Sequence, residues 1–146
     1  MGILGTRGIP VSYGGFEPLA ERLALHLVRH GMEVVVYGDR RYVQQSTPYH
    51  GVTRVNFSTP AHRGLEKLVG ASLQCLHASL RRVDVLVLLG TSPVAAAWLG
   101  RLAGCRLIHN VDGLEWRRAK WGPLAAGYLR LMERLAAATC HDLIAD

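Results

Sequence analysis

The sequence predicts an α/β fold in which helices cover both faces of a mostly parallel sheet. Two observations indicate this. Short apolar runs alternate with amphipathic stretches along all 146 residues, which is the pattern of strands joined by crossover helices. The runs within residues 32–39 and 83–90 are also apolar without a polar alternation, as in strands buried on both faces of a parallel sheet. A chain of this length suits one domain with its own core.

The first half of the chain predicts three strands and two helices. A short strand at residues 2–5 precedes a helix from Phe16 to His30, in which leucines at 19, 23 and 27 and neighbouring alanines mark one apolar face, and Gly31 ends the helix. Strands follow at 32–39 and, more weakly, at 51–57. The next helix spans residues 65–80, and its apolar residues recur at helical spacing: Leu65, Leu68, Val69, Leu76 and Leu80.

The second half continues the alternation. The strand at 83–90 is the clearest in the sequence, and "GTSP" (90–93) follows it, with Ser92 expected to cap the next helix and Pro93 expected in its first position. That helix, 93–104, is apolar nearly all round, so we expect it to be packed. A fifth strand covers 105–113, and a sixth begins at 141. Between them Pro123 to Ala138 forms a helix with four apolar residues on one face: Leu124, Tyr128, Leu131 and Leu135.

Composition and charge limit the classes of protein and of partner that fit this sequence. The formal net charge of +6 favours an anionic partner such as a nucleotide, a lipid phosphate, a membrane surface or a nucleic acid, with a solubilising surface charge as an equally good interpretation. The three cysteines, Cys75, Cys105 and Cys140, are widely spaced, which supports neither a disulfide framework nor a zinc site and indicates buried thiols in a reducing cytoplasm. No signal peptide is expected, and the longest uncharged run, residues 85–100, is short for a membrane span.

The opening loop, "GTRGIPVSYGGFE" (5–17), is longer than the two to six residues that usually join a strand to a helix. Its glycines allow close approach of a ligand to the backbone, and Gly14 and Gly15 precede a helix whose free amides favour an anion. Arg7 adds a charged donor, and Glu17 suits the positive end of the helix. A long turn that needs glycines for its own dihedral angles is the structural alternative.

The opening loop matches neither common phosphate-binding motif. It lacks the GK[ST] ending of a P-loop, and its first glycines read GxxG rather than GxGxxG. Asp39, however, follows the second strand, where a ribose-binding acid would lie. An NAD-type dinucleotide-binding oxidoreductase therefore remains an alternative.

A third unusual segment, "HNVDGLEWRRAKWG" (109–122), follows the fifth strand. Because carboxyl ends of parallel strands meet at one edge, it should lie beside the opening loop and "GTSP". It offers groups that position hydroxyls or handle a proton (His109, Asp112 and Glu115), cations for phosphates (Arg117, Arg118 and Lys120) and flat rings for a sugar or a lipid interface (Trp116 and Trp121). The structural alternatives are a core tryptophan, solvated arginines and a hydrogen-bonded histidine. "GTSP" itself fits helix capping better than ligand contact.

Together, "GTRGIPVSYGGFE" and "NVDGLEWRRAKWG" resemble the N-terminal domain of a bacterial branch of the family 4 retaining glycosyltransferases, which includes rhamnosyltransferases of capsule and exopolysaccharide synthesis. The resemblance implies a GT-B architecture, with two Rossmann-like domains facing each other across a cleft. The N-terminal domain holds the acceptor, here a lipid-linked saccharide, and the C-terminal domain grips the nucleotide-sugar donor. It also implies transfer of a hexose or rhamnose with retention, without a metal or other cofactor.

The resemblance also implies roles for individual residues. Arg7, Gly14 and Gly15 would lie near the donor diphosphate, and Glu17 would order the loop. His109 would face the donor sugar, and the catalytic group would include His109, Asp112 and Glu115. The acceptor side would be lined by the remaining basic and aromatic residues: Trp116, Arg117, Arg118, Lys120 and Trp121.

The resemblance further sets expectations for the chain as a whole. Residues 1–146 would be the acceptor-side domain, inactive without the donor-binding domain. The enzyme would be cytoplasmic and peripheral at the inner face of the cell membrane, with an anionic membrane surface as partner and no nucleic acid. A non-catalytic anion- or membrane-binding module is the remaining alternative.

Overall fold

The protein folds into alternating strands and helices in the order that the sequence predicts. The structure is a computed structural model, and it describes residues 1–11, 14–59, 65–111, 113–119 and 121–145. The elements are β1 (Gly2–Leu4), α1 (Phe16–Arg29), β2 (Val35–Asp39), β3 (Thr53–Phe57), α2 (Leu65–Leu80), β4 (Val85–Leu89), the 3₁₀ turn η1 (Val94–Ala96), α3 (Ala97–Leu102), β5 (Arg106–Val111), the 3₁₀ turn η2 (Glu115–Arg117), α4 (Pro123–Thr139) and β6 (Asp142–Ala145).

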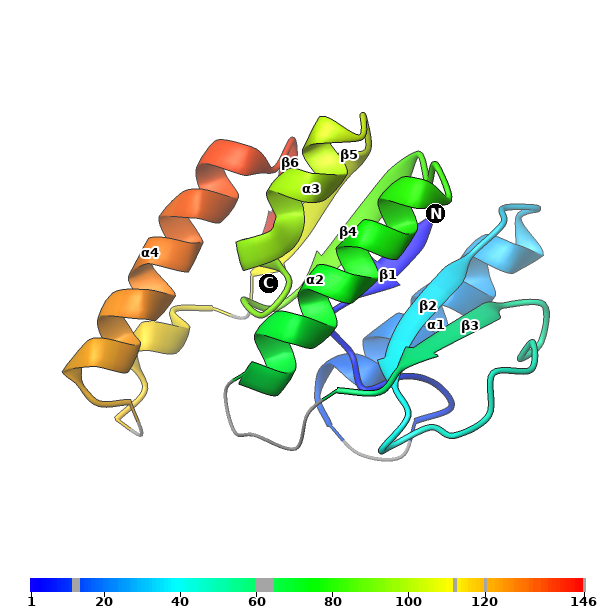
Figure 1. Ribbon diagram of the computed structural model, residues 1–146, viewed down its shortest axis with the longest axis horizontal. Coiled ribbons are helices and arrows are strands. Elements are labelled where there is room, and N and C mark those ends of the chain that lie inside the picture. The colour runs from blue at the N-terminus through cyan, green and yellow to red at the C-terminus, as the bar shows by residue number, and fades with distance from the viewer. Residues whose placement is uncertain (12–13, 60–64, 112, 120, 146) are drawn as a thin grey trace.

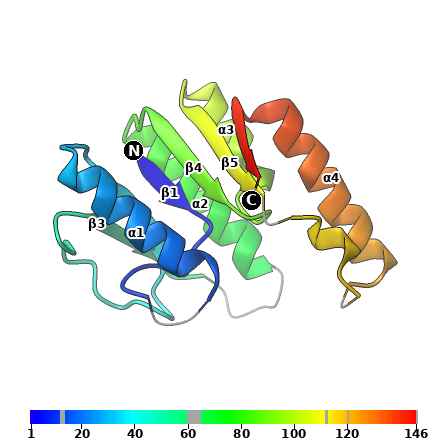
Figure 2. The same ribbon diagram turned by 180° about the vertical axis from the view of Figure 1, so that it is seen from behind.

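The six strands form one sheet in the order β3-β2-β1-β4-β5-β6, and every neighbouring pair is parallel. Helix α1 covers one face, and α2, α3 and α4 lie on the other (Figures 1 and 2). This confirms the Rossmann-like α/β class, with helices on both faces. The strand order reverses between β1 and β4, and sheets of this kind bind ligands beyond the carboxyl ends of the strands at that reversal.

Side chains of successive strand residues point to opposite faces, so one strand supplies both cores. Leu86 and Leu88 of β4 pack with α2 and α3, whereas Val87 and Leu89 pack with α1. The buried strands therefore read as the continuous apolar runs noted in the sequence. Cys75 and Cys105 are buried free thiols, as expected, and Cys140 is a half-buried free thiol.

Helix α2, on the second face of the sheet, packs inward through small residues. Helix α2 buries Ala71, Cys75 and Ala78 against the sheet, while Leu76 and Leu80 of its apolar stripe are exposed. Small side chains let the helix axis approach the sheet closely, so the larger leucines on the opposite side of the helix remain outside. The helical period of the sequence was right, but it did not identify the buried face.

The buried faces of the next two helices, α3 and α4, also differ from the prediction. The segment 93–104 is not packed all round, because Trp98 and Leu102 of α3 are exposed while Ala97 and Gly100 are buried. On α4 the residues that pack inward are Leu129, Met132 and Ala136. The predicted apolar stripe of α4 lies largely outside this contact: Leu124, Tyr128 and Leu131 are exposed, and Leu135 is half-buried. No helix in the described part of the chain is long and apolar enough to span a bilayer.

Buried hydrogen bonds fix the opening loop to β2 and β3. The Thr6 hydroxyl donates to the Tyr37 carbonyl (3.1 Å), and the Asp39 amide donates to the Arg7 carbonyl (3.2 Å). The buried guanidinium of Arg54 donates to the Ile9 carbonyl (3.1 Å) and, from Nε, to the Thr47 carbonyl (2.7 Å). The loop is thereby held over the carboxyl ends of the strands rather than left as a free connection.

Gly5 lies at a close backbone contact between the ends of β1 and β4. Its φ is +93°, and a Cβ atom there would lie 2.0 Å from the Leu89 carbonyl oxygen at the end of β4. Gly104 also has a positive φ (+85°), but a Cβ there would meet open space.

We expect Gly5→Ala to lower the free energy of unfolding by at least about 2 kcal/mol, because it adds a backbone clash to left-handed strain. Gly104→Ala adds the strain alone and should cost about 1 kcal/mol. Urea denaturation followed by circular dichroism measures both. Equal losses for the two variants would contradict the close approach of β1 and β4.

Candidate functional site

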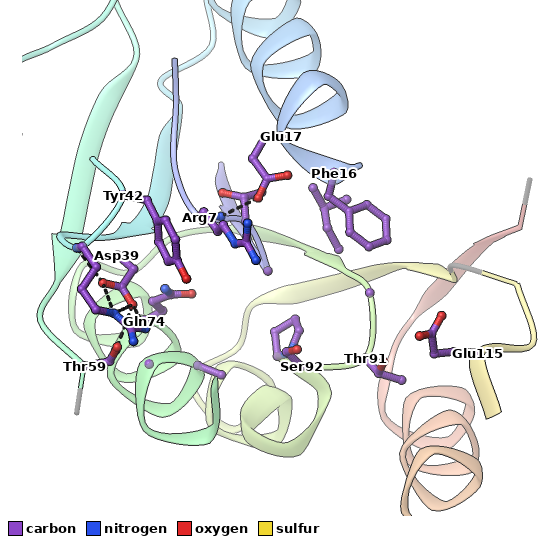
Figure 3. A pocket seen from close by; sticks show the side chains of 18 residues that line it. Arg7, Phe16, Glu17, Asp39, Tyr42, Thr59, Gln74, Thr91, Ser92 and Glu115 are labelled. Atoms are coloured by element: carbon purple, nitrogen blue, oxygen red, sulfur yellow. Dashed lines mark hydrogen bonds and ion pairs between the residues drawn. The ribbon is translucent and has the colours of Figure 1, made fainter. Parts of the chain in front are cut away.

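A cavity of about 260 Å³ lies where the strand order reverses, at the carboxyl ends of β1, β2 and β4 (Figure 3). We call it the switch-point cavity. Its lining joins the opening loop, the turn after β4 and η2, so the three segments expected at one edge do meet there. It is lined by Gly5, Thr6, Arg7, Phe16, Glu17, Asp39, Arg41, Tyr42, Thr59, Gly70, Ala71, Gln74, Leu89, Gly90, Thr91, Ser92, Pro93 and Glu115.

Glu17 orders the opening loop from the first turn of α1, as the sequence indicated. Its side chain is buried, and Oε1 accepts a hydrogen bond from the backbone amide of Arg7 (3.0 Å). A Cβ atom on Gly14, whose φ is +125°, would lie 1.9 Å from Glu17 Oε2. Only glycine therefore fits at position 14 while this carboxylate stays in place.

Of the three residues expected near a diphosphate, one lines the switch-point cavity and two do not. Arg7 lines the cavity, and its guanidinium carbon lies 4.7 Å from the centroid of the Tyr42 ring. Gly15 is the N-cap of α1, and Gly14 precedes it; neither lines the cavity. The first turn of α1 reaches the cavity instead through Phe16.

Asp39 is engaged within the protein. Arg41 donates to its carboxylate from Nε (3.0 Å to Oδ2), and the Thr59 hydroxyl donates to Oδ2 (2.6 Å). Burial by itself raises the pKa of Asp39, but the hydrogen bonds from Arg41 and Thr59 outweigh it and hold the pKa below its ordinary value. The carboxylate that could have bound a ribose is thus already paired, which disfavours the dinucleotide alternative.

His109 lies behind the turn that follows β4. Its side chain is 1% exposed, and Nε2 lies 3.0 Å from the Gly90 carbonyl oxygen. Burial lowers the pKa of His109, and the hydrogen bond to Gly90 only partly opposes this. The imidazole is therefore neutral at pH 7, with Nε2–H as the donor and Nδ1 as an acceptor. His109 does not line the switch-point cavity.

His109 Nδ1 is buried and has no hydrogen-bond partner among the described residues. His109 lines a second cavity of about 20 Å³, which we call the inner cavity and which has room for roughly one water molecule. Its lining shares Thr91 and Glu115 with the switch-point cavity. The full lining is Thr91, His109, Val111, Gly113, Glu115, Trp116, Leu129 and Glu133.

Glu115 is the member of the third segment that reaches the switch-point cavity. Its carboxylate accepts hydrogen bonds from Trp121 Nε1 (3.2 Å) and lies 3.0 Å from Arg118 Nε. This carboxylate is therefore oriented by two neighbours from its own segment. Asp112 and Lys120, which the sequence placed in the catalytic and acceptor groups, lie outside the described residues.

Trp116 packs on α4 rather than in the switch-point cavity. Its indole Nε1–H donates to Glu133 Oε2 (2.8 Å), and the guanidinium carbons of Arg117 and Arg130 lie 5.0 Å and 3.9 Å from the centroid of its ring. Both arginines are exposed. The segment thus contributes two groups of contacts, one around Trp116 on α4 and one around Glu115, and Glu115 lines the larger cavity.

Ser92 does not cap a helix as the sequence predicted. The 3₁₀ turn η1 has Pro93 as its N-cap and no side-chain cap, and its first amide, that of Val94, donates to the Thr91 carbonyl (3.3 Å). Thr91 and Ser92 line the switch-point cavity instead. The Val94 amide, which a Ser92 N-cap would bind, is therefore already engaged by the Thr91 carbonyl.

Sequence reasoning missed four polar residues of this cavity, Arg41, Tyr42, Thr59 and Gln74. Tyr42 and Thr59 follow the carboxyl ends of β2 and β3, where that position alone could have marked them. Gln74 is a buried polar residue on the sheet-facing side of α2, with Nε2 3.4 Å from the Gly38 carbonyl. A lone amide in an apolar stretch was its signal in the sequence.

We expect Asp39→Asn to lower the free energy of unfolding at pH 7 by about 1–3 kcal/mol, because it breaks a buried, charged hydrogen-bond group. The native pKa is depressed, so this stability is complete above the ordinary pKa of 3.8 and disappears as the pH falls through the lower native value. Wild type and variant should therefore converge in acid.

Asp142→Asn is the control, since Asp142 makes an exposed ion pair with Arg106 (2.9 Å) that should contribute little. Denaturation curves at several pH values test both variants. A loss at pH 7 no larger for Asp39→Asn than for this control would contradict the buried pairing.

Comparison with known families agrees with this architecture. A family model described as "Glycosyl transferase 4-like domain" matches residues 14–145, which is most of the chain. A comparison with curated proteins found no significant match. The matched region contains every element from α1 to β6. The chain belongs to the glycosyl transferase 4-like domain family.

Proposed function

We propose that this chain is the acceptor-side domain of a retaining glycosyltransferase that moves a hexose or rhamnose from a nucleotide-sugar to a lipid-linked saccharide in the synthesis of bacterial surface polysaccharide. Membership of the family supports glycosyl transfer. The observation that carries the proposal further is the polar switch-point cavity, whose size suits part of a sugar ligand and whose opening lies at the ligand-binding edge of the sheet.

The cavity favours an anionic or hydroxyl-rich ligand. Its carboxylates are engaged: Glu17 by the Arg7 amide, Asp39 by Arg41, and Glu115 by Arg118. The hydroxyls of Thr91 and Ser92 remain at the surface of the cavity for a sugar. In this proposal Arg7, together with the amides at Gly14 and Gly15, lies against the donor diphosphate.

In this proposal Glu115, which lines the switch-point cavity, is a catalytic residue. Its carboxylate accepts from an acceptor hydroxyl and so holds the attacking oxygen in position. The leaving phosphate takes the proton of that hydroxyl, and no metal or cofactor is needed for this step. Asp112 and Lys120, with Trp116, Arg117, Arg118 and Trp121, complete the acceptor side.

His109 has a positioning role in this proposal. Its Nε2–H bond to Gly90 fixes the turn that carries Thr91 and Ser92 into the cavity. A neutral ring in a buried site provides a donor whose direction does not change near pH 7. In this proposal His109 therefore positions the sugar-facing turn.

The direct test is a transfer assay on the full-length protein with a panel of nucleotide-sugars and lipid-linked acceptors. The proposal predicts product whose anomeric configuration matches that of the donor, as read by NMR. Glu115→Gln should lower kcat/KM about ten- to hundredfold, because the acceptor hydroxyl is no longer held by a carboxylate.

Glu33→Gln is the matched control for Glu115→Gln. Glu33 is an exposed carboxylate that precedes β2, at the opposite edge of the sheet, and its replacement should leave kcat/KM unchanged. An inverted product, or a Glu115→Gln enzyme with wild-type activity, would contradict the proposal.

For His109 we expect the neutral Nε2–H tautomer at pH 7, visible in long-range ¹H–¹⁵N spectra of the imidazole. His109→Leu should lose about 1–3 kcal/mol of stability because the Gly90 carbonyl is left without its donor. The same variant should reduce kcat more than it changes KM, and His109→Gln, which keeps an N–H donor, should restore part of both losses. An Nδ1–H tautomer, or an unaffected Leu variant, would show that His109 does not hold this turn.

A further inference from the structure

The part of the switch-point cavity that is formed by α2 and by the chain after β3 carries polar side chains that belong to no motif (Figure 3). Gly70 and Gln74 of α2 both line it, and four residues place them about one helical turn apart on one face. Gly70 is buried, and a Cβ atom there would lie 3.0 Å from the methyl carbon of Thr59. Thr59 therefore packs on α2 one turn before Gln74.

The side-chain amide of Gln74 has a fixed direction. Gln74 is 7% exposed, and its Nε2–H donates to the Gly38 carbonyl (3.4 Å). A backbone carbonyl only accepts, so the nitrogen faces Gly38 and Oε1 points elsewhere. Within the described part of the chain Gln74 Oε1 has no hydrogen-bond partner, and it is not one of the fully buried atoms that lack one. Because Gln74 lines the cavity, this oxygen is an acceptor that a ligand can reach.

The hydroxyl of Thr59 also has a fixed direction. Its Oγ1 lies 2.6 Å from Asp39 Oδ2. Burial raises the pKa of Asp39, but the hydrogen bonds from Arg41 and Thr59 outweigh it and hold the pKa below its ordinary value. The side chain of Asp39 is therefore a carboxylate at pH 7, which only accepts, so the Thr59 proton points to Asp39. For a ligand, Thr59 Oγ1 offers lone pairs and no proton.

Thr59 and Gln74 thus present one polarity to the cavity. A sugar hydroxyl can donate to either oxygen, whereas an anionic oxygen of a phosphate or carboxylate would meet only lone pairs. The positive charge of Arg7 lies elsewhere in the lining, against the Tyr42 ring, 4.7 Å from its centroid. A site whose polar groups would be left unpaired by the wrong ligand discriminates strongly against that ligand.

We propose that Thr59 and Gln74 are specificity-determining residues of the switch-point cavity, which accept hydrogen bonds from adjacent hydroxyl groups of a sugar ring. The inference rests on the proposed function for the sugar and goes beyond it in giving the ring an orientation. The uncharged ring lies against α2 and Thr59. Any phosphate of the ligand lies away from them, toward Arg7.

The test uses the full-length protein with methyl glycosides of glucose, galactose and rhamnose, which contain the ring without a phosphate. The side-chain amide signal of Gln74 in ¹H–¹⁵N NMR spectra reports binding. At least one glycoside should shift this signal, and inorganic phosphate at the same concentration should not. Replacing a contacting hydroxyl of that glycoside by fluorine, which is similar in size but cannot donate, should weaken binding about three- to tenfold.

Two variants test the residues themselves, with affinities measured by saturation-transfer NMR. Gln74→Met and Thr59→Val each remove one acceptor, and each should bind the glycoside about three- to tenfold more weakly and lose preference for hydroxyl over fluorine. Thr59→Ser keeps the hydroxyl and should bind like wild type. Ser79→Ala is the matched control on α2, since the Ser79 hydroxyl donates to the Cys75 carbonyl (2.8 Å) and does not line the cavity.

The fluorine comparison uses wild type alone, so it decides the question even where a variant melts early. A Gln74 signal that no glycoside shifts, or that phosphate shifts, would overturn the inference. Fluorinated analogues that all bind like their parents, or wild-type affinity in folded Gln74→Met and Thr59→Val, would do the same. The proposed function fails separately: a protein that binds glycosides at Gln74 but transfers no sugar would overturn that proposal alone.

Discussion

The contact between the ends of β1 and β4 determines where the switch-point cavity lies. Gly5 lies against the Leu89 carbonyl, and Gly90, the residue after β4, has a positive φ and packs against the Phe16 ring. From this contact the chain after β1 turns toward β2, while the chain after β4 turns toward η1. The two connections separate, and the switch-point cavity is the space between them.

Around that contact, hydrogen bonds from two buried polar side chains hold the loops that leave the sheet. Glu17 holds the opening loop by the Arg7 amide, and His109 holds the opposite turn by the Gly90 carbonyl. Both groups are buried, so each holds a backbone group of a loop in a setting of low dielectric constant. The cavity is thus bounded on two sides by loops that are positioned before any ligand arrives, which is the condition for specific binding.

Much of the fold could be predicted from the sequence, because short-range patterns mark the strands and the ends of helices. The apolar runs at 32–39 and 83–90 contain β2 and β4, as expected of strands in a parallel sheet that is covered on both faces, and Gly31 follows the end of α1 with a positive φ. The meeting of the three loops at one edge of the sheet could be predicted because the strands are parallel. Which side of α2 or α4 packs inward did not follow, because small residues such as Ala71 and Ala136 carry little hydrophobic signal.

The site was less predictable than the fold because its details depend on partners far apart in the sequence. Asp39 looks like a ribose ligand until Thr59 is seen to donate to it, and His109 looks accessible until the Gly90 turn is seen to cover it. Tyr42, Thr59 and Gln74 belong to no motif and enter the cavity through the paths of β2, β3 and α2. Residue types and spacing indicated the edge of the sheet, and tertiary contacts decide which groups line the switch-point cavity.

The central claim is that the switch-point cavity receives a part of the sugar ligand. Hydrogen–deuterium exchange of the full-length protein, with and without a panel of nucleotide-sugars, tests it most directly. The account predicts that a bound nucleotide-sugar slows exchange in residues 5–11 and 90–96, the two loops that border the cavity. Slower exchange confined to other regions, such as the amino ends of the strands near Glu33 and Asp84, would contradict it.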